Sequence, residues 1–247
     1  MNAPAHPPPH PLPAVMTRES ATTSPLAAKW REARNLAKFI VRQRTRGFDV
    51  PSRPHFDPQS EPVFEALLRQ AGSYLEYGSG GSTVLAARLG VPTVTVESDR
   101  FYARSVRAAI GERARNRMLV PDIGVTCEWG TPLVKHATPA RLRRWRRYVE
   151  APFAVCAEEA TPFFDLVLVD GRFRVACALA CAREAALRGQ ALTLCLDDYV
   201  GRPWYHSVEQ FLGTPRLAGR MAIFDVSPAK QHFAMEQAID AAIADWR

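Results

Sequence analysis

The sequence lacks the features of a membrane-spanning or secreted protein. No stretch approaches the roughly 18 consecutive apolar residues that a transmembrane helix needs. The opening residues, MNAPAHPPPHPLPAV, contain no basic segment followed by an apolar one, so we do not expect a secretory signal. The chain also has no internal repeat, which argues against a solenoid or propeller.

Cysteine is scarce and is not arranged in the pairs that typically bind zinc. The chain has five cysteines in 247 residues and no C-x-x-C motif. An odd number without such a pair favours reduced thiols in the core of a cytoplasmic protein. Cys177 and Cys181 lie four positions apart in a predicted helix. They are better explained as buried residues on one helix face than as metal ligands.

The sequence does contain enough apolar residues for a sizeable core, and it has an excess of positive charge. Hydrophobic residues make up 47%, and 32 Lys and Arg against 25 Asp and Glu give a net charge of +7. The length suits one α/β domain with a tail. The basic balance is compatible with nucleic acid, acidic lipid or an anionic substrate, and it does not choose among them.

The N-terminal part differs in composition from the rest. Residues 1–27 are rich in Pro, Ala, Ser and Thr, and we expect them to be a disordered tail. Residues 28–58 read as a basic helix followed by a loop, because apolar side chains recur at helical spacing between Arg and Lys over 29–48. A helix packed on the domain is favoured over one lying on a membrane surface.

Residues 59–247 alternate between strand and helix signals. Such alternation predicts a Rossmann-like, doubly wound α/β fold with a mostly parallel sheet covered by helices on both faces. The almost wholly apolar run 164–170 is typical of a central strand. The predicted strands are 73–77, 92–98, 123–129, 164–170, 191–197 and 222–226. The predicted helices are 60–71 with Ser60 as N-cap, 99–115, 174–189 ended by Gly189, 207–212 and a C-terminal segment.

The turn after the first predicted strand is rich in glycine. Residues 75–83 read L-E-Y-G-S-G-G-S-T, between a predicted strand and a predicted helix. Gly78 can adopt the tight turn, and Gly80 and Gly81 have no side chains to block a ligand near the backbone. Glu97 ends the second predicted strand, 19 positions after Gly78. That placement suits a carboxylate that accepts hydrogen bonds from ribose hydroxyls.

Two cofactors bind to such a turn, and Glu76 and Thr83 distinguish them. A nicotinamide dinucleotide requires G-x-G-x-x-G, but the sixth position here is Thr83. A carboxylate at Glu76 would repel a pyrophosphate and attract the ammonium and sulfonium groups of S-adenosylmethionine (SAM). The sequence therefore favours SAM.

Four segments, E-Y-G-S-G-G-S-T, V-E-S-D, F-D-L-V-L-V-D-G and L-D-D-Y, together resemble the ordered motifs of class I SAM-dependent methyltransferases over roughly residues 60–226. The resemblance implies seven strands with the last one antiparallel. It places Glu97 on the ribose and Ser98 and Asp99 near the adenine; Ser82 departs from the family's third glycine. The implied cofactor-binding residues are Glu76, Gly78, Ser79, Gly80, Gly81, Ser82, Thr83, Glu97, Ser98, Gly130, Thr131 and Asp170.

The V-D-G and D-D-Y segments resemble those of macrocin-type O-methyltransferases, and catechol O-methyltransferases have a related pattern of acids. In both groups these acids bind a divalent metal, which would be Mg²⁺ here. The pattern departs at Arg172 and Phe173, where macrocin-type enzymes have an acid and a histidine. Without a metal, Asp170 would contact the methionine amino group or the substrate, and Arg172 and Arg174 would hold an anion. The implied metal ligands are Asp170, Asp197 and Asp198.

Converging carboxylates repel one another, so a positive group should lie beside them: Mg²⁺, the SAM ammonium or Arg172. We expect Asp170 and Asp198 to face the substrate and to be needed for turnover. His206 lies eight residues after Asp198, in a loop where methyltransferases often place substrate-binding residues. A surface or capping role for His206 is equally consistent with its position.

The leading functional hypothesis is a SAM-dependent methyltransferase of a small molecule, with O-methylation favoured. A catalytically degenerate SAM-binding interaction domain is the alternative from a different class, because no catalytic base is obvious. An RNA methyltransferase is supported only by charge. The arginine-rich run 141–148 has an apolar stripe through Leu142, Trp145 and Val149, which favours a solvated helix over an RNA-binding element.

Overall fold

The computed structural model describes residues 25–112, 115–159, 163–228 and 232–247. Most of the predicted N-terminal tail, residues 1–24, lies outside the described residues. The chain divides into two compact units, residues 1–37 and 38–247, and the second contains everything discussed below. The predicted basic helix is α1, Pro25–Thr45, which spans this division. None of the described helices combines the length and the apolar character that crossing a membrane would require.

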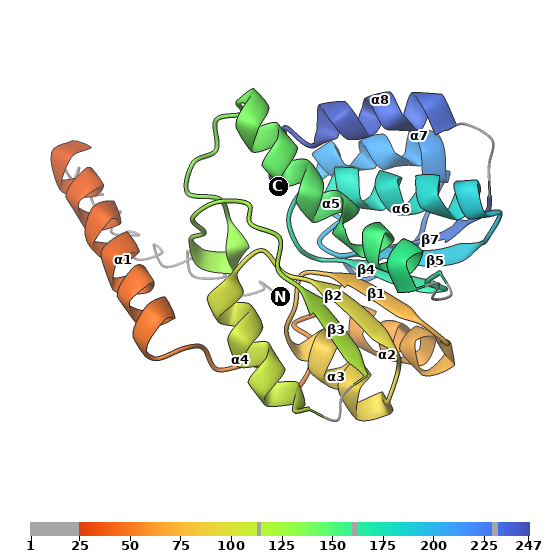
Figure 1. Cartoon of the computed structure of the whole chain (residues 1–247), viewed down its shortest axis with the longest axis horizontal. Coiled ribbons are helices and arrows are strands. Elements are labelled where there is room, and N and C mark those ends of the chain that lie inside the picture. Colours follow the sequence, from red (N-terminus) through yellow and green to blue (C-terminus); the bar gives the residue numbers. More distant parts are fainter. Residues whose placement is uncertain (1–24, 113–114, 160–162, 229–231) are drawn as a thin grey trace, which may run out of the picture. The chain divides into compact units, whose positions relative to one another are not determined.

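A seven-stranded sheet forms the centre of the second unit, with the order β3-β2-β1-β4-β5-β7-β6 (Figure 1). Strands β1 to β5 pair in parallel, and β7 runs antiparallel to both β5 and β6. This confirms the predicted fold class and the antiparallel last strand. The strands are β1 Tyr74–Tyr77, β2 Thr93–Val96, β3 Asn116–Leu119, β4 Leu166–Val169, β5 Leu192–Leu196, β6 Arg216–Ala218 and β7 Met221–Val226.

Helices cover both faces of the sheet because the central strands are apolar on both sides. Leu75 and Val167 pack in one hydrophobic core with α5, α6 and α8, while Tyr74 and Leu166 pack in a second core with α2 and α3. Neighbouring residues point to opposite faces of a strand, so each strand serves both cores. The helices are α2 Ser60–Gln70, α3 Gly81–Leu89, α4 Arg100–Ile110, α5 Pro139–Glu159, α6 Arg174–Arg188, α7 Glu209–Leu212 and α8 His232–Ala242, with short 3-10 helices at Glu128–Gly130 and Pro203–Val208.

The prediction of the third strand was wrong. β3 is Asn116–Leu119, whereas residues 123–127 form a loop with one isolated β-bridge and lead into the 3-10 helix Glu128–Gly130. β3 is an edge strand with β2 as its neighbour, so its side chains are mixed in polarity and give little strand signal. The preceding helix, α4, ends at Ile110 instead of residue 115. The apolar alternation over 123–129 belongs instead to a loop that reaches the cavity described below.

The start of α2 also differs from the prediction. Ser60 is the first helical residue, and the side chain that caps the helix belongs to Asp57. Its carboxylate accepts hydrogen bonds from the backbone N–H groups of Gln59 (2.9 Å) and Ser60 (3.1 Å). The Ser60 hydroxyl donates to the backbone oxygen of Ala218 (2.8 Å). The side chain that caps α2 is therefore that of Asp57, three residues before Ser60, and the local sequence does not distinguish these two candidates.

Candidate functional site

A cavity of about 880 Å³ opens at the carboxyl ends of the parallel strands, where open α/β sheets bind ligands. The loops after β1, β2, β4 and β5 line it, together with residues 39–56 and 128–131. It brings together most of the predicted site residues, and Glu76, Thr83 and His206 are not among its lining residues. Predicted residues that line it are Gly78, Ser79, Gly80, Gly81, Ser82, Glu97, Ser98, Gly130, Thr131, Asp170, Asp197 and Asp198.

Two glycines of the turn are required by the protein's own backbone. Gly78 has a φ of +95°, and a Cβ there would lie 3.0 Å from the backbone nitrogen of Gly171. A Cβ on Gly81 would lie 1.7 Å from the backbone oxygen of Arg53. The glycines therefore let the loop after β4 and the segment near residue 53 approach the turn closely, in addition to leaving room for a ligand.

Glu76 lies beneath the turn instead of facing the cavity. Glu76 is 1% exposed. Its carboxylate accepts hydrogen bonds from the hydroxyls of Ser82 and Thr83, the latter at 2.6 Å. The Thr83 hydroxyl in turn accepts from the backbone N–H of Gly80 (2.9 Å). Burial raises the pKa of Glu76 to about 8, against the lowering effect of the two hydroxyls. In this arrangement Glu76 and Thr83 hold the start of α3 in place.

The raised pKa of Glu76 predicts how the stability of the folded protein depends on pH. The folded protein holds a proton on Glu76 up to about pH 8, whereas the unfolded chain loses it near pH 4.5, so this contribution to stability is present at low pH and is lost as the pH rises through 8. We expect Glu76→Gln, which stays neutral, to lose less stability than the wild type between about pH 5 and about pH 9. Urea unfolding at both pH values measures it. Parallel pH dependence in the two proteins would contradict the assignment.

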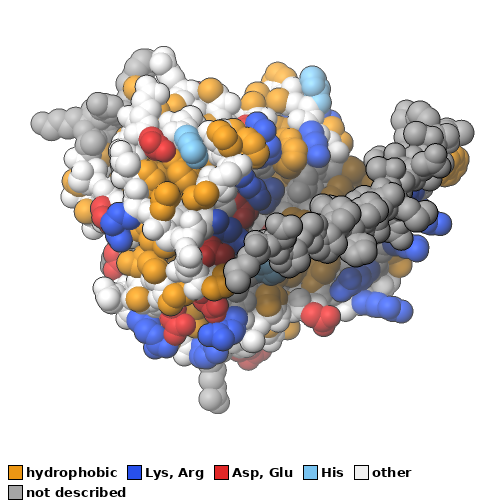
Figure 2. Space-filling model, turned by 180° about the vertical axis from the view of Figure 1, so that it is seen from behind, with side chains coloured by type: hydrophobic (Ala, Val, Ile, Leu, Met, Phe, Trp, Pro, Cys, Tyr) orange, Lys and Arg blue, Asp and Glu red, His pale blue; other side chains and the backbone are white. Residues whose placement is uncertain are grey.

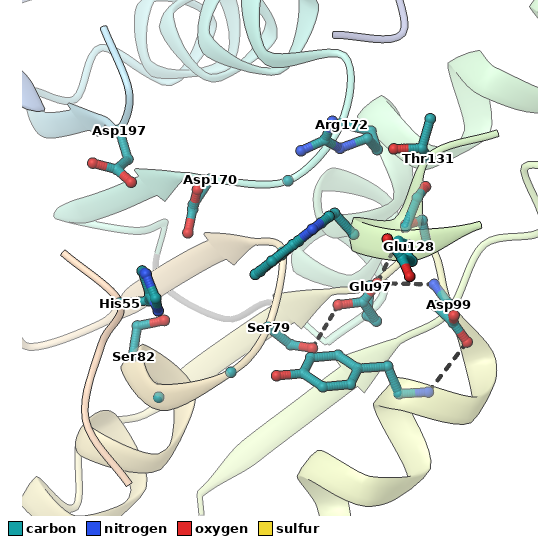
Figure 3. A pocket seen from close by; sticks show the side chains of 18 of the residues that line it. His55, Ser79, Ser82, Glu97, Asp99, Glu128, Thr131, Asp170, Arg172 and Asp197 are labelled. Carbon is teal, nitrogen blue, oxygen red and sulfur yellow. Dashed lines mark hydrogen bonds between the residues drawn. The ribbon is translucent and has the colours of Figure 1, made fainter. Parts of the chain in front are cut away.

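Glu97 follows β2 and faces the cavity (Figure 3). One carboxylate oxygen accepts from the Ser79 hydroxyl at 2.5 Å, and the other accepts from the backbone N–H of Asp99 at 2.8 Å. Burial raises the pKa of Glu97, partly offset by these hydrogen bonds. The Ser79–Glu97 bond joins the ends of β1 and β2, so it fixes the carboxylate at the edge of the turn.

The loop before α5 closes this end of the cavity. The Ser98 hydroxyl donates to the backbone oxygen of Gly130 (3.2 Å), and a Cβ on Gly130 would lie 2.4 Å from that hydroxyl oxygen. Asp99 caps α4 by accepting from the backbone N–H of Phe101 (2.8 Å). Trp129 adopts a left-handed backbone (φ 60°), is 81% exposed and lines the cavity. The sequence analysis did not single out Trp129.

Three aspartates meet at the opposite end of the cavity, after β4 and β5. Carboxylate oxygens of this acidic cluster, Asp170, Asp197 and Asp198, lie within 4.8 Å of one another. Asp170 pairs with Arg174 (2.9 Å) and Asp197 pairs with Arg220 (2.9 Å). Asp198 pairs with three guanidinium groups: Arg174 at 3.2 Å, Arg202 at 2.8 Å and Arg220 at 3.1 Å.

These ion pairs bear on the predicted magnesium site. Three guanidinium groups match three carboxylates in charge and occupy the oxygens that a metal would need. Arg174 is 3% exposed and also donates to backbone oxygens, so it is part of the fold. The acidic cluster, with its carboxylates paired to arginines, therefore does not fit Mg²⁺.

The residue that forms the ion pair with Asp170 is Arg174, while Arg172, one of the positive groups expected beside the acids, acts on Asp170 through its nearby charge. Arg174 forms that pair because it is the first residue of α6, and helical side chains point back toward the N-terminus, here onto Asp170 four positions earlier. Arg202 stands in the same relation to Asp198. This Asp–Arg spacing is the sequence signal that could have revealed both pairs. Arg220 lies in the turn between β6 and β7, and no such local signal indicates its pairing with the acids.

Asp170 differs from its neighbours in being accessible. Its side chain is 38% exposed and it lines the cavity, whereas Asp197 is 1% exposed. Burial and the charges of Asp197 and Asp198 raise the pKa of Asp170 to about 6, although Arg174 opposes the shift. Asp170 is therefore a carboxylate that exchanges protons near neutral pH.

Two histidines differ in their position relative to the cavity. His206 is exposed and stacks on Tyr199 with ring centroids 4.5 Å apart. His55 lines the cavity, near Ser82 in the view of Figure 3, and comes from a stretch that the sequence analysis treated only as a loop. His55 belongs to a loop and lines the cavity only in the folded chain, so no local sequence pattern indicates this role.

A comparison with solved structures places this geometry among known proteins. A methyltransferase-like protein from Silicibacter pomeroyi is 37% identical, covers 79% of this chain and 100% of its own, and has a TM-score of 0.67. The T. thermophilus 16S rRNA methyltransferase RsmC, in complex with AdoMet and guanosine, is 19% identical, covers 70% of this chain and 41% of its own, and has a TM-score of 0.33. Podospora anserina methyltransferase PaMTH1, bound to SAH, is 16% identical, covers 90% of this chain and 84% of its own, and has a TM-score of 0.38.

The last two likenesses are too distant to support a conclusion about this chain. No protein-family model matches the sequence, and no curated protein matches it. The first likeness extends over the whole of the other protein at more than a third identity. Together with the seven-stranded sheet and the cavity at its carboxyl edge, it shows that the chain belongs to the family of methyltransferase-like proteins that the Silicibacter pomeroyi structure represents.

Proposed function

We propose that the chain binds SAM in this cavity and transfers its methyl group to a small molecule. The observation that carries the proposal is the pairing of Ser79 with Glu97, which places a fixed carboxylate beside a glycine turn in a cavity of about 880 Å³. A cavity of that size is in the range of pockets that hold a cofactor or a drug-sized ligand.

The proposed orientation of SAM follows from the chemistry of the walls. In this proposal Glu97 accepts hydrogen bonds from the ribose hydroxyls, because it is the buried carboxylate that both lines the cavity and bonds to Ser79 of the turn. The adenine lies beside Ser98, Gly130 and Thr131, and the methionine part lies along residues 78–82 toward Asp170. Glu76 and Thr83 support the turn from below and do not contact the cofactor in this proposal.

Bound SAM would supply an electrophilic methyl group on a sulfonium. The acceptor atom would take this methyl group as the carbon–sulfur bond breaks, leaving S-adenosylhomocysteine, and the acceptor would give up a proton. Asp170 is placed to take the proton, because it faces the cavity and its pKa of about 6 leaves it ionised at neutral pH. Asp198, which three arginines hold, is a positioning residue in this scheme. O-methylation remains the favoured chemistry, since a hydroxyl acceptor needs such a base.

A small molecule is favoured over RNA by the arrangement of the arginines. In the run 141–148, Trp145 is buried, Arg146 pairs with Glu236 (3.0 Å) and Arg144 with Asp122 (3.7 Å). On the face drawn in Figure 2, basic side chains are interspersed with acidic and apolar ones. These pairs use charge that an RNA-binding surface would present to phosphates. The odd number of cysteines and the absence of a C-x-x-C pair favour reduced thiols, so we propose the cytoplasm as the compartment.

Binding of SAM tests the proposal directly. Glu97→Ala is expected to weaken SAM about ten- to a hundredfold, because it removes a charge-assisted hydrogen bond worth about 1.5–3 kcal/mol. Isothermal titration calorimetry measures it. The matched control is Glu65→Ala, which removes a partly buried acid on α2 that pairs with Arg69 and does not line the cavity, and which should leave the affinity unchanged.

Two results would overturn the assignment. Wild-type affinity in Glu97→Ala would remove Glu97 from the ribose. Tighter binding of NAD than of SAM by the wild type would remove SAM as the cofactor.

A further inference from the structure

Arg172 is a cationic side chain on the cavity wall whose Nε has no hydrogen-bond acceptor among the described residues, although the charge of Asp170 acts on it. The side chain lines the cavity, and its Nε is buried. Within the described part of the chain its guanidinium makes no ion pair, in contrast to Arg174, Arg202 and Arg220 nearby. Figure 3 draws Arg172 across the cavity from Ser79 and Ser82, without a hydrogen bond to any other residue drawn.

The backbone around Arg172 is held firmly. Its N–H donates to the Tyr148 hydroxyl (3.5 Å), and its carbonyl oxygen accepts from the Cys177 thiol (3.4 Å). Phe173, the next residue, adopts a left-handed backbone (φ 56°) and packs fully buried against Trp145, with ring centroids 5.3 Å apart. A non-glycine residue in that conformation is strained, and such strain persists where the surroundings fix it. The side chain of Arg172 is therefore presented from a fixed point.

A buried donor without an acceptor is unfavourable. Leaving such a group unpaired costs about 1–3 kcal/mol, and more when it is charged. Burial, with the nearby charge of Arg174, lowers the pKa of Arg172. A guanidinium has a flat array of donors that fits the two oxygens of a carboxylate or phosphate. An oxyanion entering the cavity would supply the missing hydrogen-bond acceptor, and its negative charge would add to that of Asp170 in stabilising the guanidinium.

We propose that the methyl acceptor carries an oxyanion, a carboxylate or a phosphate, that binds the guanidinium of Arg172. The inference rests on the proposed function, because it assigns the substrate class of that site. Asp170 lies two residues earlier on the same wall and faces the same cavity. Holding the anion at Arg172 would keep the rest of the acceptor beside Asp170, which would set the position of the hydroxyl to be methylated.

Calorimetry with small probes tests the proposal on the full-length protein. Benzoate and phenyl phosphate are titrated into the protein with and without saturating S-adenosylhomocysteine (SAH), and benzamide is the neutral control. We expect at least one anion to bind and benzamide not to. Arg172→Gln should weaken the anion about ten- to a hundredfold, and Arg172→Lys, which keeps the charge without the flat donor array, should lose less. The two probes distinguish a carboxylate from a phosphate acceptor.

Three results would overturn the proposal: no anion binds, benzamide binds as well as benzoate, or Arg172→Gln binds the anion like the wild type. A loss of SAH affinity in Arg172→Gln would show that Arg172 holds the cofactor, which also overturns it. If the wild type does not bind SAH at all, the proposed function fails instead, and the titrations without SAH report on the anion separately.

Discussion

Replacing Arg174 with alanine is expected to destabilise the fold by about 3–5 kcal/mol, as is typical when one partner of a buried ion pair is removed. The guanidinium of Arg174 is 3% exposed and makes five hydrogen bonds, three of them to the backbone oxygens of Asp170, Gly171 and Asp197. It thus ties together the chain segments that follow β4 and β5. Its loss would leave Asp170 and Asp198 facing each other with less positive charge between them.

Urea unfolding followed by circular dichroism measures this loss. Arg172→Ala is the matched control, because it lies two residues away, makes no ion pair in the described chain and removes a buried donor that has no acceptor, so it should not lower the stability. Arg174→Lys keeps the charge but cannot make all five bonds, so its stability should fall between the wild type and Arg174→Ala. Equal stability of Arg172→Ala and Arg174→Ala would show that the network contributes nothing specific.

Asp170→Asn is expected to reduce methyl transfer about 10²- to 10⁴-fold, the usual contribution of a general base. Asparagine has nearly the same size but cannot accept the acceptor's proton. Because Asp170 acts in its ionised form, wild-type activity should fall as the pH drops through about 6 and stay level above it. Adding EDTA should leave the activity unchanged, since arginines and not Mg²⁺ balance the acidic cluster.

A radiolabelled methyl-transfer assay against metabolite extracts gives the rate, and calorimetry with SAM shows that the variant still binds its cofactor. Asp225→Asn is the matched control, because Asp225 is 70% exposed on β7 and should be replaceable without effect. Activity retained in Asp170→Asn would place the base elsewhere in the cavity. Activity removed by EDTA and restored by Mg²⁺ would reinstate a metal at the acidic cluster.

The features that the sequence predicted correctly are those written in neighbouring residues. The apolar strands β1, β4 and β5, the glycine turn before α3 and the left-handed Gly189 that ends α6 each have a short-range pattern. The carboxyl ends of parallel strands meet at one edge of a sheet. The convergence of Glu97, Asp170, Asp197 and Asp198 on one cavity could therefore be deduced from their positions after strands.

The sequence left open the partners that side chains find across the fold. The carboxylate of Glu76, a predicted cofactor-binding residue, accepts hydrogen bonds from the hydroxyls of Ser82 and Thr83. Arg220 reaches the acidic cluster from far along the chain, and residues 39–56 cross the cavity with His55. The edge strand β3 has too little burial to leave a pattern. The sequence by itself determined the fold class and which segments face the site, because periodicity and turn chemistry are local. Tertiary structure alone decided which charges neutralise each other and left Arg172 without an ion pair among the described residues, because ion pairing depends on distances between residues far apart in the chain.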